Sequence, residues 1–554
     1  MPIGFGKNCE PISDSIRLPI NAASHPRIAG QLTLLRRHAL FIGLFVVVAA
    51  ARFAILFASQ THVHSDEAII GLMGKHILEA HHFPFYMYGQ PYNGGAAWEA
   101  YLAAVAFALF GVGVVPLKGC IVILSLLCLV LFYRMGCALY DQRTALFATV
   151  AFVLAPSLLK WHFQVRGYSG YFLSIPVLTL LFASIQSASV PKRRTLFLFG
   201  LASGLSIWCL ELVVPLIGAL WLLLILRRKI SMSRAQAGLI GLLLGYAPVV
   251  VFNLLHRFSN WRYVAVESPG GGFRAIVQLS NWRRIFLDEM PKFFGPDTVL
   301  WYYGEKPAVG YVFYGIALFA LGVGIWPFVR APRKVLGAIR GDLADARQKS
   351  DFDMVVLTAA SFVPYLTLIP GVPSYFLGGC FFISMLTGRM LERGFSASTS
   401  LPRVSAAAAL GAILLTGIFV HIRVGQINQI ETLSVCEGGK TYCMTRISAA
   451  DIDGVHRALK QRNVTSVWTT ISFVYPLLFE SNEELAVSNE ILETPYLVYP
   501  EDVPWREPRR DREATFVLET DAPIRSLVET RCEKIFGSPP LAREYGKLVV
   551  ISNP

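Results

Sequence analysis

The feature that most limits the fold of this chain is a series of apolar segments, each about as long as a bilayer is thick. The first reads "ALFIGLFVVVAAARFAILFAS" (39–59) and is apolar apart from Arg52. A helix of about 20 such residues crosses a hydrocarbon layer of ~30 Å. Ten further runs follow, at 116–133, 144–161, 169–188, 195–210, 212–226, 235–255, 308–329, 352–370, 374–391 and 404–422. The pattern predicts a polytopic, all-α membrane protein with about 11 transmembrane helices.

The amino-acid composition also indicates a membrane protein, and it limits what the positive net charge of the chain can mean. Hydrophobic residues make up 54% of the 554 residues and charged residues only 16%. The net charge of +13 does not indicate nucleic-acid binding, because the Lys and Arg residues lie between apolar runs and no zinc-ligand spacing or basic helix is present. The charge instead predicts membrane topology.

The basic loops predict which side of the membrane each connection faces. Arg-rich residues 1–37 place the N-terminus in the cytoplasm. If 96–111 lies along the membrane surface, alternation then puts all the basic loops in the cytoplasm: 133–143, 191–194, 227–229, 330–350 and 389–403. If 96–111 crosses the membrane, every later loop changes sides. We therefore expect an inner-membrane protein with three outer segments: 60–115, 257–307 and everything after 423.

The C-terminal part, 425–554, differs in composition from the membrane domain, 38–424. It contains 14 Lys and Arg against 19 Asp and Glu, a net charge of −5. Its patterns predict a capped amphipathic helix at 449–464 and strands at 465–475, 514–520 and 546–552. We expect a small soluble α/β domain outside the membrane.

Two cysteines of this domain stand in "CEGGKTYC", with a Gly-Gly turn between them. Outside the cytoplasm, Cys436 and Cys443 are expected to close a short disulfide loop, the alternative being that both thiols stay reduced. Their spacing, without a nearby His, does not favour a metal site, and no metal is expected elsewhere in the chain.

The stretch "HSDEAIIG" (64–71) places Asp66 and Glu67 side by side just after the first apolar run. One interpretation is structural: Ser65 caps a helix from Asp66 to Glu79, and acidic residues suit its first turn. The surrounding loop favours a functional interpretation, because it brings together cations, aromatic rings, glycines and a further carboxylate. Such groups at a membrane surface suit a polar substrate such as a sugar, and the candidates for binding it are Lys75, Tyr88, Gln90, Tyr92 and Glu99.

A second polar group lies in "KWHFQVRGYSGYF" (160–172), which joins two apolar runs on the same side. Ionisable residues at a membrane boundary are functional candidates, and here they are His162, Arg166 and Tyr168. For Lys160 and His162 the alternative is ordinary snorkelling. Arg166 is the best candidate to bind a phosphate, because guanidinium pairs with phosphate through two hydrogen bonds. Glu211, at the outer tip of the 195–226 hairpin, is a secondary candidate with helix packing as the alternative.

Several of these motifs together resemble a known family. "SDEA" after the first helix, "GQPYNGG" before "WEAYLAAVAFALFG", the "YRMGCALYDQRTALFATVAFVLAP" hairpin and "RGY" are similar to GT-C glycosyltransferases of the protein O-mannosyltransferase and lipid A aminoarabinose transferase superfamily, in particular its bacterial family 39-like members. The resemblance covers 40–230 well and the later helices only by pattern.

The resemblance implies a GT-C fold and an inverting sugar transfer. The donor is a polyprenyl-phosphate sugar, the acceptor a hydroxyl of a lipid, polysaccharide or protein, and no cofactor is needed. Asp66 corresponds to the catalytic base, with Glu67 beside it. Relatives often carry a Lys or His where this chain has Gln90, so another cation must hold the phosphate: Arg166, or one of Arg262, Arg274, Arg283 and Arg284 in the second outer loop.

Two other classes of function compete with the enzyme. A transporter or flippase of lipid-linked glycan predicts charges near the bilayer midplane and internal repeats, whereas the carboxylates here cluster at one surface. A non-catalytic membrane scaffold, in which the soluble domain binds a partner, predicts that Asp66 is dispensable.

Overall fold

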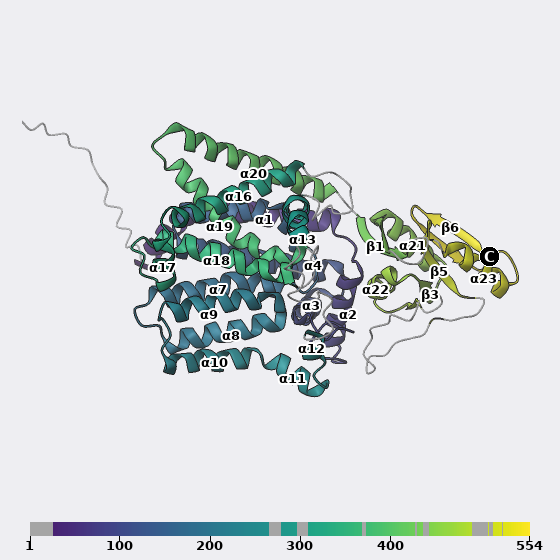
Figure 1. Ribbon diagram of the computed structural model, residues 1–554. Coiled ribbons are helices and arrows are strands. Elements are labelled where there is room, and N and C mark those ends of the chain that lie inside the picture. The colour runs from purple at the N-terminus through teal and green to yellow at the C-terminus, as the bar shows by residue number, and fades with distance from the viewer. Residues whose placement is uncertain are drawn as a thin grey trace, which may run out of the picture. The chain divides into compact units, whose positions relative to one another are not determined.

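The structure is a computed structural model that describes residues 26–264, 279–295, 308–367, 373–426, 429–435, 442–489, 508, 513–522 and 524–554. The chain divides into two compact units, 1–46 and 47–554, and the contacts described below lie within the second unit. Figure 1 shows the helices of the membrane part and the C-terminal strands. Cys436 and Arg274 lie outside the described residues, so the disulfide and the role of Arg274 stay predictions.

Helices account for nearly all of the described membrane part. The first group is α1 (Pro26–Ser59), α2 (Ser65–Leu78) and α3 (Gly94–Phe110). The next group is α4 (Val114–Leu139), α5 (Gln142–Leu154), α6 (Pro156–Leu159), η1 (Lys160–His162), α7 (Ser169–Ser187), α8 (Arg193–Cys209), η2 (Glu211–Val213), α9 (Val214–Leu226), α10 (Met232–Gly245), α11 (Ala247–Leu255) and α12 (Ser259–Arg262). The last group is α13 (Leu279–Arg284), η5 (Ile285–Glu289), α14 (Met290–Phe293), α16 (Ala308–Arg330), α17 (Arg333–Arg340), α18 (Ala346–Thr367), η6 (Pro373–Phe376), α19 (Leu377–Phe395) and α20 (Ser400–Gln426).

Each of the predicted apolar runs falls on a helix or a pair of helices. Within the described residues, 5 helices are long and apolar enough to cross a membrane: His38–Ser59, Val114–Leu139, Ser169–Ser187, Gly310–Arg330 and Ser400–Gln426. The count rises to 7 if two bent pairs, Gln142–His162 and Met232–Leu255, are each one span. The chain is a multi-pass membrane protein, and the predicted count of 11 spans stays a prediction. The segment 96–111 is helical as α3, one of the shorter apolar helices.

The helices α8 and α10 pack closely because glycines face each other along both. A Cβ on Gly200 would lie 1.8 Å from the carbonyl oxygen of Gly238, and one on Gly204 would lie 2.3 Å from that of Leu242. Small residues at four-residue spacing allow this approach where the hydrophobic effect does not drive helices together. The contact holds α8, the helix that leads to Glu211, against α10.

The C-terminal part contains a five-stranded mixed sheet in the order β4-β3-β5-β7-β6. The strands are β3 (Ser466–Thr469), β4 (Ala486–Ser488), β5 (Thr515–Glu519), β6 (Leu541–Tyr545) and β7 (Leu548–Ser552), and a separate pair joins β1 (Gln429–Val435) to β2 (Tyr442–Ser448). The helices are α21 (Ala449–Gln461), α22 (Ile471–Glu480) and α23 (Arg525–Phe536). Strands β3, β4 and β5 are parallel, and β7 runs antiparallel to its two neighbours. The predicted α/β class of this domain is confirmed.

Side chains alternate between two cores across this sheet. Trp468, Phe516 and Ile551 pack with α23 on one face. Val467, Val517 and Val550 belong to a larger core that includes α22 and residues of α2 and α3. Successive residues of a strand point to opposite faces, so strands buried on both faces are apolar throughout.

One prediction for this domain was wrong. Residues 465–475 were expected to form one strand, but β3 ends at Thr469 and α22 begins at Ile471. Thr470 has the extended backbone of an N-cap residue. Residues 472–479 are all buried, because α22 lies between the sheet and α2. A short helix buried all round has no polar face, and its sequence therefore resembles a buried strand.

Candidate active site

The helix α2 presents the Asp-Glu pair at its first turn. Its N-cap is His64, and not Ser65 as the sequence suggested: the His64 side chain accepts a hydrogen bond from the Asp66 N–H (3.2 Å). The Glu67 carboxylate accepts the His64 N–H in return (3.2 Å), which completes a capping box. The Ser65 hydroxyl instead donates to the Ser472 carbonyl at the start of α22 (2.9 Å).

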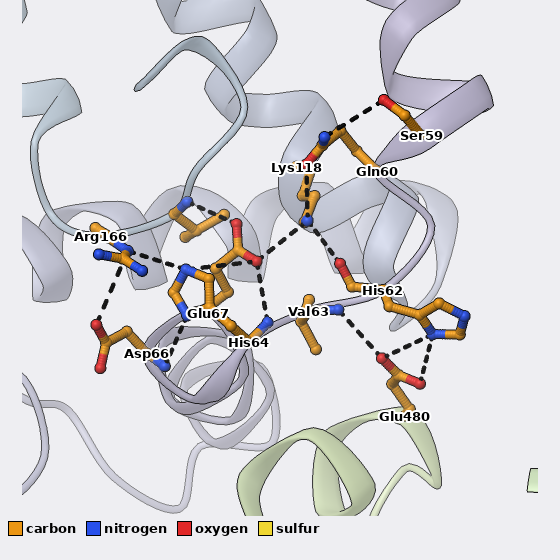
Figure 2. A network of polar contacts seen from close by, with 11 residues as sticks. Ser59, Gln60, His62, Val63, His64, Asp66, Glu67, Lys118, Arg166 and Glu480 are labelled. Carbon is orange, nitrogen blue, oxygen red and sulfur yellow. Dashed lines mark hydrogen bonds and ion pairs between the residues drawn. The ribbon is translucent and has the colours of Figure 1, made fainter. Parts of the chain in front are cut away.

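Asp66 and Arg166 lie next to each other, although a hundred residues separate them. The Arg166 Nε is 3.9 Å from the Asp66 Oδ2, and the side chains are 30% and 50% exposed, respectively. Figure 2 shows both at the edge of a network of buried polar residues. The structure therefore brings together the proposed base and the proposed phosphate ligand, with both open to solvent.

Glu67 is buried and holds neighbouring segments in place. It is 1% exposed and lies 3.1 Å from the Nζ of Lys118, itself 3% exposed, on α4. Its other oxygen accepts the Val165 N–H (3.2 Å). Lys118 also donates to the His62 carbonyl (2.6 Å), so the pair joins α2, α4, the 60–64 loop and the loop that carries Arg166. Figure 2 shows this arrangement.

Sequence reasoning missed Lys118. The signal was present, because Lys118 is a lone cation at the start of the apolar run 116–133, and an ionisable residue in such a run usually has a specific partner.

Glu99 binds the backbone just after Arg166, as Glu67 binds the backbone just before it. Its carboxylate is fully buried and accepts the N–H groups of Gly167 (2.7 Å) and Ser169 (2.9 Å). Burial raises the pKa of Glu99 to about 7, although these two N–H groups favour the charged form. Arg166 thus stands between backbone groups that two buried carboxylates hold, Glu67 on one side and Glu99 on the other.

Glycines let α3 approach this loop. A Cβ on Gly95 would lie 1.9 Å from the Gly167 carbonyl oxygen, and Gly167 itself has φ +83°. Any other residue at either position would push the loop away from α3. The "NGG" segment (93–95) thus permits close backbone contact.

His64 links the cap of α2 to Arg166. Its Nε2 lies 2.9 Å from the Arg166 Nε–H, while its Nδ1 faces the Asp66 N–H. Burial, with the charges of Arg166, Lys118 and Lys160, holds the pKa of His64 well below its usual value. A neutral imidazole has one nitrogen that accepts and one that donates, so the ring satisfies only one of these two donors at a time.

Comparisons with known proteins identify the fold. No protein-family model matches this sequence, and no curated protein matches it. Two of the solved structures that resemble the chain are ArnT from Cupriavidus metallidurans bound to undecaprenyl phosphate (TM-score 0.55, 12% identity) and the same protein in the apo state (TM-score 0.53, 13% identity). Each match covers 93% of this chain and 98% of that chain. ArnT is a GT-C protein.

The chain has a GT-C fold. The fold class expected from the sequence, a GT-C membrane domain followed by a small soluble α/β part, is confirmed. At this level of identity, the likeness concerns the fold alone.

Other residues expected to bind substrate lie elsewhere in the GT-C fold. The Lys75 Nζ contacts the Glu483 carboxylate (2.6 Å), and the Tyr88 hydroxyl lies 3.0 Å from the Nδ1 of His76, which also faces Glu483. Lys75 is nine residues from Asp66, or about 13 Å along the helix. These residues join α2 to the segment after α22.

A further group lies around the chain turn before α3. Tyr92 stacks on Tyr263 (4.5 Å between ring centroids), and Asn260 donates to the Pro91 carbonyl (2.7 Å) and approaches Glu211 (3.4 Å). Asn93 donates to the Arg166 carbonyl (3.4 Å), which links this group to the site. Gln90 is half-buried in the same turn.

The structure also places the candidates Tyr168, His162 and Arg284. Tyr168 packs on Trp161 (4.4 Å between centroids), and His162 is buried inside the membrane domain. Of the second-loop cations, Arg284 pairs with Glu289 (2.8 Å). Among the described residues, no group of three or more His, Cys, Asp or Glu side chains could hold a metal ion.

The C-terminal part contacts the loop that precedes the Asp-Glu pair. The Glu480 carboxylate of α22 accepts the Val63 N–H (3.2 Å) and pairs with His62 and His456 (3.1 Å each). Burial alone would raise the pKa of Glu480, but hydrogen bonds from His456 and His62 outweigh it and lower the pKa to about 2. Burial would lower the pKa of His62, yet the hydrogen bond and charge of Glu480, with Asp453, outweigh burial and the nearby Lys118 and raise it.

This contact is expected to loosen as the pH rises. The pKa of His62 is raised above its ordinary value of 6.5. Below pH 6.5, protonated His62 therefore stabilises its contact with Glu480 in full. The stabilisation is lost as the pH rises through the raised pKa, while Glu480 stays charged throughout. Hydrogen exchange of residues 60–64, corrected for the intrinsic rate, should be less protected at pH 9 than at pH 6.

His62→Gln should abolish this pH dependence. His81→Gln is the matched control, because His81 is 46% exposed and faces Glu79 at the far end of α2. Equal protection of residues 60–64 in the wild-type protein at both pH values would contradict this role of His62.

Proposed function

We propose that this protein is a glycosyltransferase that moves a sugar from a polyprenyl-phosphate carrier to a hydroxyl acceptor at the outer face of the membrane. The observation that carries the proposal is the half-exposed Asp66 beside Arg166, both positioned by buried residues of a GT-C fold. The ArnT structure with the same fold was solved with undecaprenyl phosphate, a lipid carrier of the proposed class. The outer location follows from the distribution of basic loops.

In the proposed reaction, Asp66 acts as the general base. The acceptor oxygen attacks C1 of the donor sugar and forms the new glycosidic bond, while Asp66 takes the hydroxyl proton. The bond between C1 and the phosphate oxygen breaks, and its electron pair leaves with the polyprenyl phosphate. A single displacement of this kind inverts the configuration at C1.

Arg166 is proposed to hold the phosphate of the donor and of the leaving group. Its guanidinium can form two parallel hydrogen bonds to phosphate oxygens. If Arg166 turns toward the phosphate, the single lone pair of the neutral His64 ring becomes available to the Asp66 N–H, which would stabilise the first turn of α2 around the base.

Glu67, Lys118 and Glu99 are assigned a positioning role in this scheme. Their charged groups are buried and face backbone N–H groups or each other. Catalytic geometry must be held to within a fraction of an ångström, and buried hydrogen bonds supply that rigidity.

Chemical turnover separates the proposal from its alternatives. The full-length protein in detergent would be incubated with polyprenyl-phosphate hexoses and pentoses and a membrane extract as the acceptor source, and free polyprenyl phosphate would be measured by mass spectrometry. A transferase releases polyprenyl phosphate in step with a new glycoside. A flippase moves an intact fluorescent donor across sealed vesicles without releasing it, and a scaffold does neither, so either result would overturn the proposal.

Arg166→Ala is expected to weaken donor binding about 10- to 100-fold, the usual contribution of a charge-assisted hydrogen bond. Its phosphate partner is present in both ground and transition states, so the loss should appear mainly in Kd and KM and less in kcat. Arg525→Ala is a matched control, because Arg525 is also partly exposed (26%) and faces carboxylates, but on the sheet domain. Unchanged donor affinity in Arg166→Ala would contradict the phosphate assignment.

A further inference from the structure

A short amphipathic helix follows directly after one of the candidate spans. The span is Gly310–Arg330 on α16, and the helix is α17, Arg333–Arg340, which reads "RKVLGAIR". Ala331 and Pro332 are the only residues between them. Because α16 is long and apolar enough to cross a membrane, a helix this close to its end lies near the bilayer surface.

One side of α17 is fixed to the helices of the membrane domain. Ala338 is fully buried, and its carbonyl oxygen accepts from the Nε (3.1 Å) and the Nη2 (3.0 Å) of Arg227. Arg227, at the end of α9, is itself 5% exposed and donates through Nη1 to the Asp353 carboxylate on α18 (3.0 Å). A buried guanidinium with several partners has one geometry, so the outer side of α17 has a fixed direction.

The outer side of α17 combines two arginines with a leucine. Arg333, Leu336 and Arg340 follow each other at intervals of three and four residues, which places them on one side of a helix. Leu336 is 56% exposed, and both arginines are exposed. Within the part of the chain that the structure describes, neither arginine has a carboxylate at ion-pair distance. Their charges are therefore available to a partner.

The last turn of α16 has the same combination of apolar and basic side chains. Trp326 and Val329 are 53% and 61% exposed. The Arg330 guanidinium lies 4.7 Å from the centre of the Trp326 ring. Tryptophan is enriched where a span meets the membrane–water boundary, so this turn marks the level of the lipid headgroups.

The nearby carboxylates do not neutralise this region. Asp345 accepts the N–H groups of Arg347 (2.9 Å) and Gln348 (3.3 Å) at the start of α18, and Asp342 is exposed beyond the end of α17. From 330 to 350 the sequence has six Lys and Arg against two Asp, a net charge of +4. The charge complements an anionic surface.

We propose that α17 binds the headgroups of anionic phospholipids through Arg333 and Arg340, with Leu336 inserted at the level of the acyl chains. A guanidinium forms two hydrogen bonds to a phosphate, and an apolar residue beside it favours a lipid over a soluble phosphate. A second copy of the chain, packed through the same face, would bring like charges together. The inference does not rest on glycosyl transfer.

Hydrogen exchange of α17 in lipid nanodiscs tests this proposal. The full-length protein would be placed in nanodiscs of phosphatidylcholine, alone or mixed with phosphatidylglycerol. Exchange of the amides of 333–340 should slow in phosphatidylglycerol by about fivefold for each arginine that meets the anionic surface. High salt should remove the difference, because it screens exposed charges.

Variants of exposed residues assign the effect without endangering the fold. Arg333→Gln combined with Arg340→Gln should remove the difference between the two lipids. Arg193→Gln combined with Arg194→Gln is the matched control, because it removes the same charge from exposed residues at the start of α8, and it should keep the difference. Leu336→Ser should speed exchange in both lipids, because the apolar contact is lost.

Three results would overturn the proposal. The first is an equal exchange rate in the two lipids, or a lipid difference that the double variant of α17 keeps. The second is equal slowing by soluble glycerol phosphate in detergent, which would assign this face to a free phosphate. The third is slowing that grows with protein concentration in lipid-free detergent, which would assign it to a second copy of the chain.

Discussion

Asp66→Asn is expected to reduce the turnover of the full-length protein about 10²- to 10⁴-fold, the usual contribution of a general base. Asparagine keeps the size of the side chain and the Asp66 N–H that caps α2, but it cannot accept the acceptor's proton. Arg166 is unaltered, so donor affinity should persist. The measurement is release of polyprenyl phosphate at saturating donor, alongside an independent donor-binding assay.

Asp521→Asn is the matched control for this substitution, because Asp521 is an exposed carboxylate of the sheet domain. It should leave turnover unchanged. If Asp66→Asn kept near-normal transfer to a hydroxyl acceptor, the Asp-Glu pair would be no more than the start of a helix, and the assignment of Asp66 as the base would be lost.

Glu67→Gln should act mainly on stability. Removing one charge of the buried Glu67–Lys118 pair leaves Lys118 uncompensated, which costs about 3–5 kcal/mol in comparable buried pairs. The glutamine oxygen can still accept one backbone N–H, so the remaining folded molecules should lose less turnover than Asp66→Asn. Denaturant or thermal unfolding in detergent measures the first effect, and kcat per folded molecule measures the second.

A double variant separates loss of charge from loss of shape. Glu67→Gln with Lys118→Met removes both charges and should recover part of the lost stability, which an effect of side-chain shape alone would not allow. Glu79→Gln on the same helix is a control, because its ion pair with Lys75 is partly exposed and such pairs contribute about 0–1 kcal/mol. If Glu67→Gln unfolded no more readily than Glu79→Gln, the positioning role of Glu67 would be wrong.

The membrane class was predictable from sequence because lipid constrains each segment locally, whereas the GT-C fold was expected from the resemblance of a few motifs to a known family. A backbone in hydrocarbon must satisfy its own hydrogen bonds, so a span is an apolar helix whatever its neighbours are. The first span His38–Ser59 is an example. The strands β5 and β7 were predictable for a similar reason, since both are short apolar runs between turn residues. Residues 471–480 were not, because their neighbours on both sides bury the whole helix.

The parts of the candidate site were visible in the sequence, but its assembly was not. Asp66, Glu67, Glu99 and Arg166 were candidates by residue type and location near the membrane surface. Nothing in their spacing distinguished the exposed Asp66 from the buried Glu67, one residue along the chain. Lys75 and Tyr88 were also candidates to bind substrate, but in the structure Lys75 contacts Glu483 and Tyr88 contacts His76.

The local patterns of the chain predict that it crosses the membrane repeatedly, forms an α/β fold in its C-terminal part and places carboxylates and an arginine in loops expected on one face. Which of these side chains meet depends on how the helices pack. The N-terminus of α3 reaches the Arg166 loop because Gly95 and Gly167 have no side chains, and Glu67 and Glu99 then bind the backbone on either side of Arg166. Contacts of this kind depend on distances between segments 68 to 98 residues apart, which local pattern and propensity do not encode.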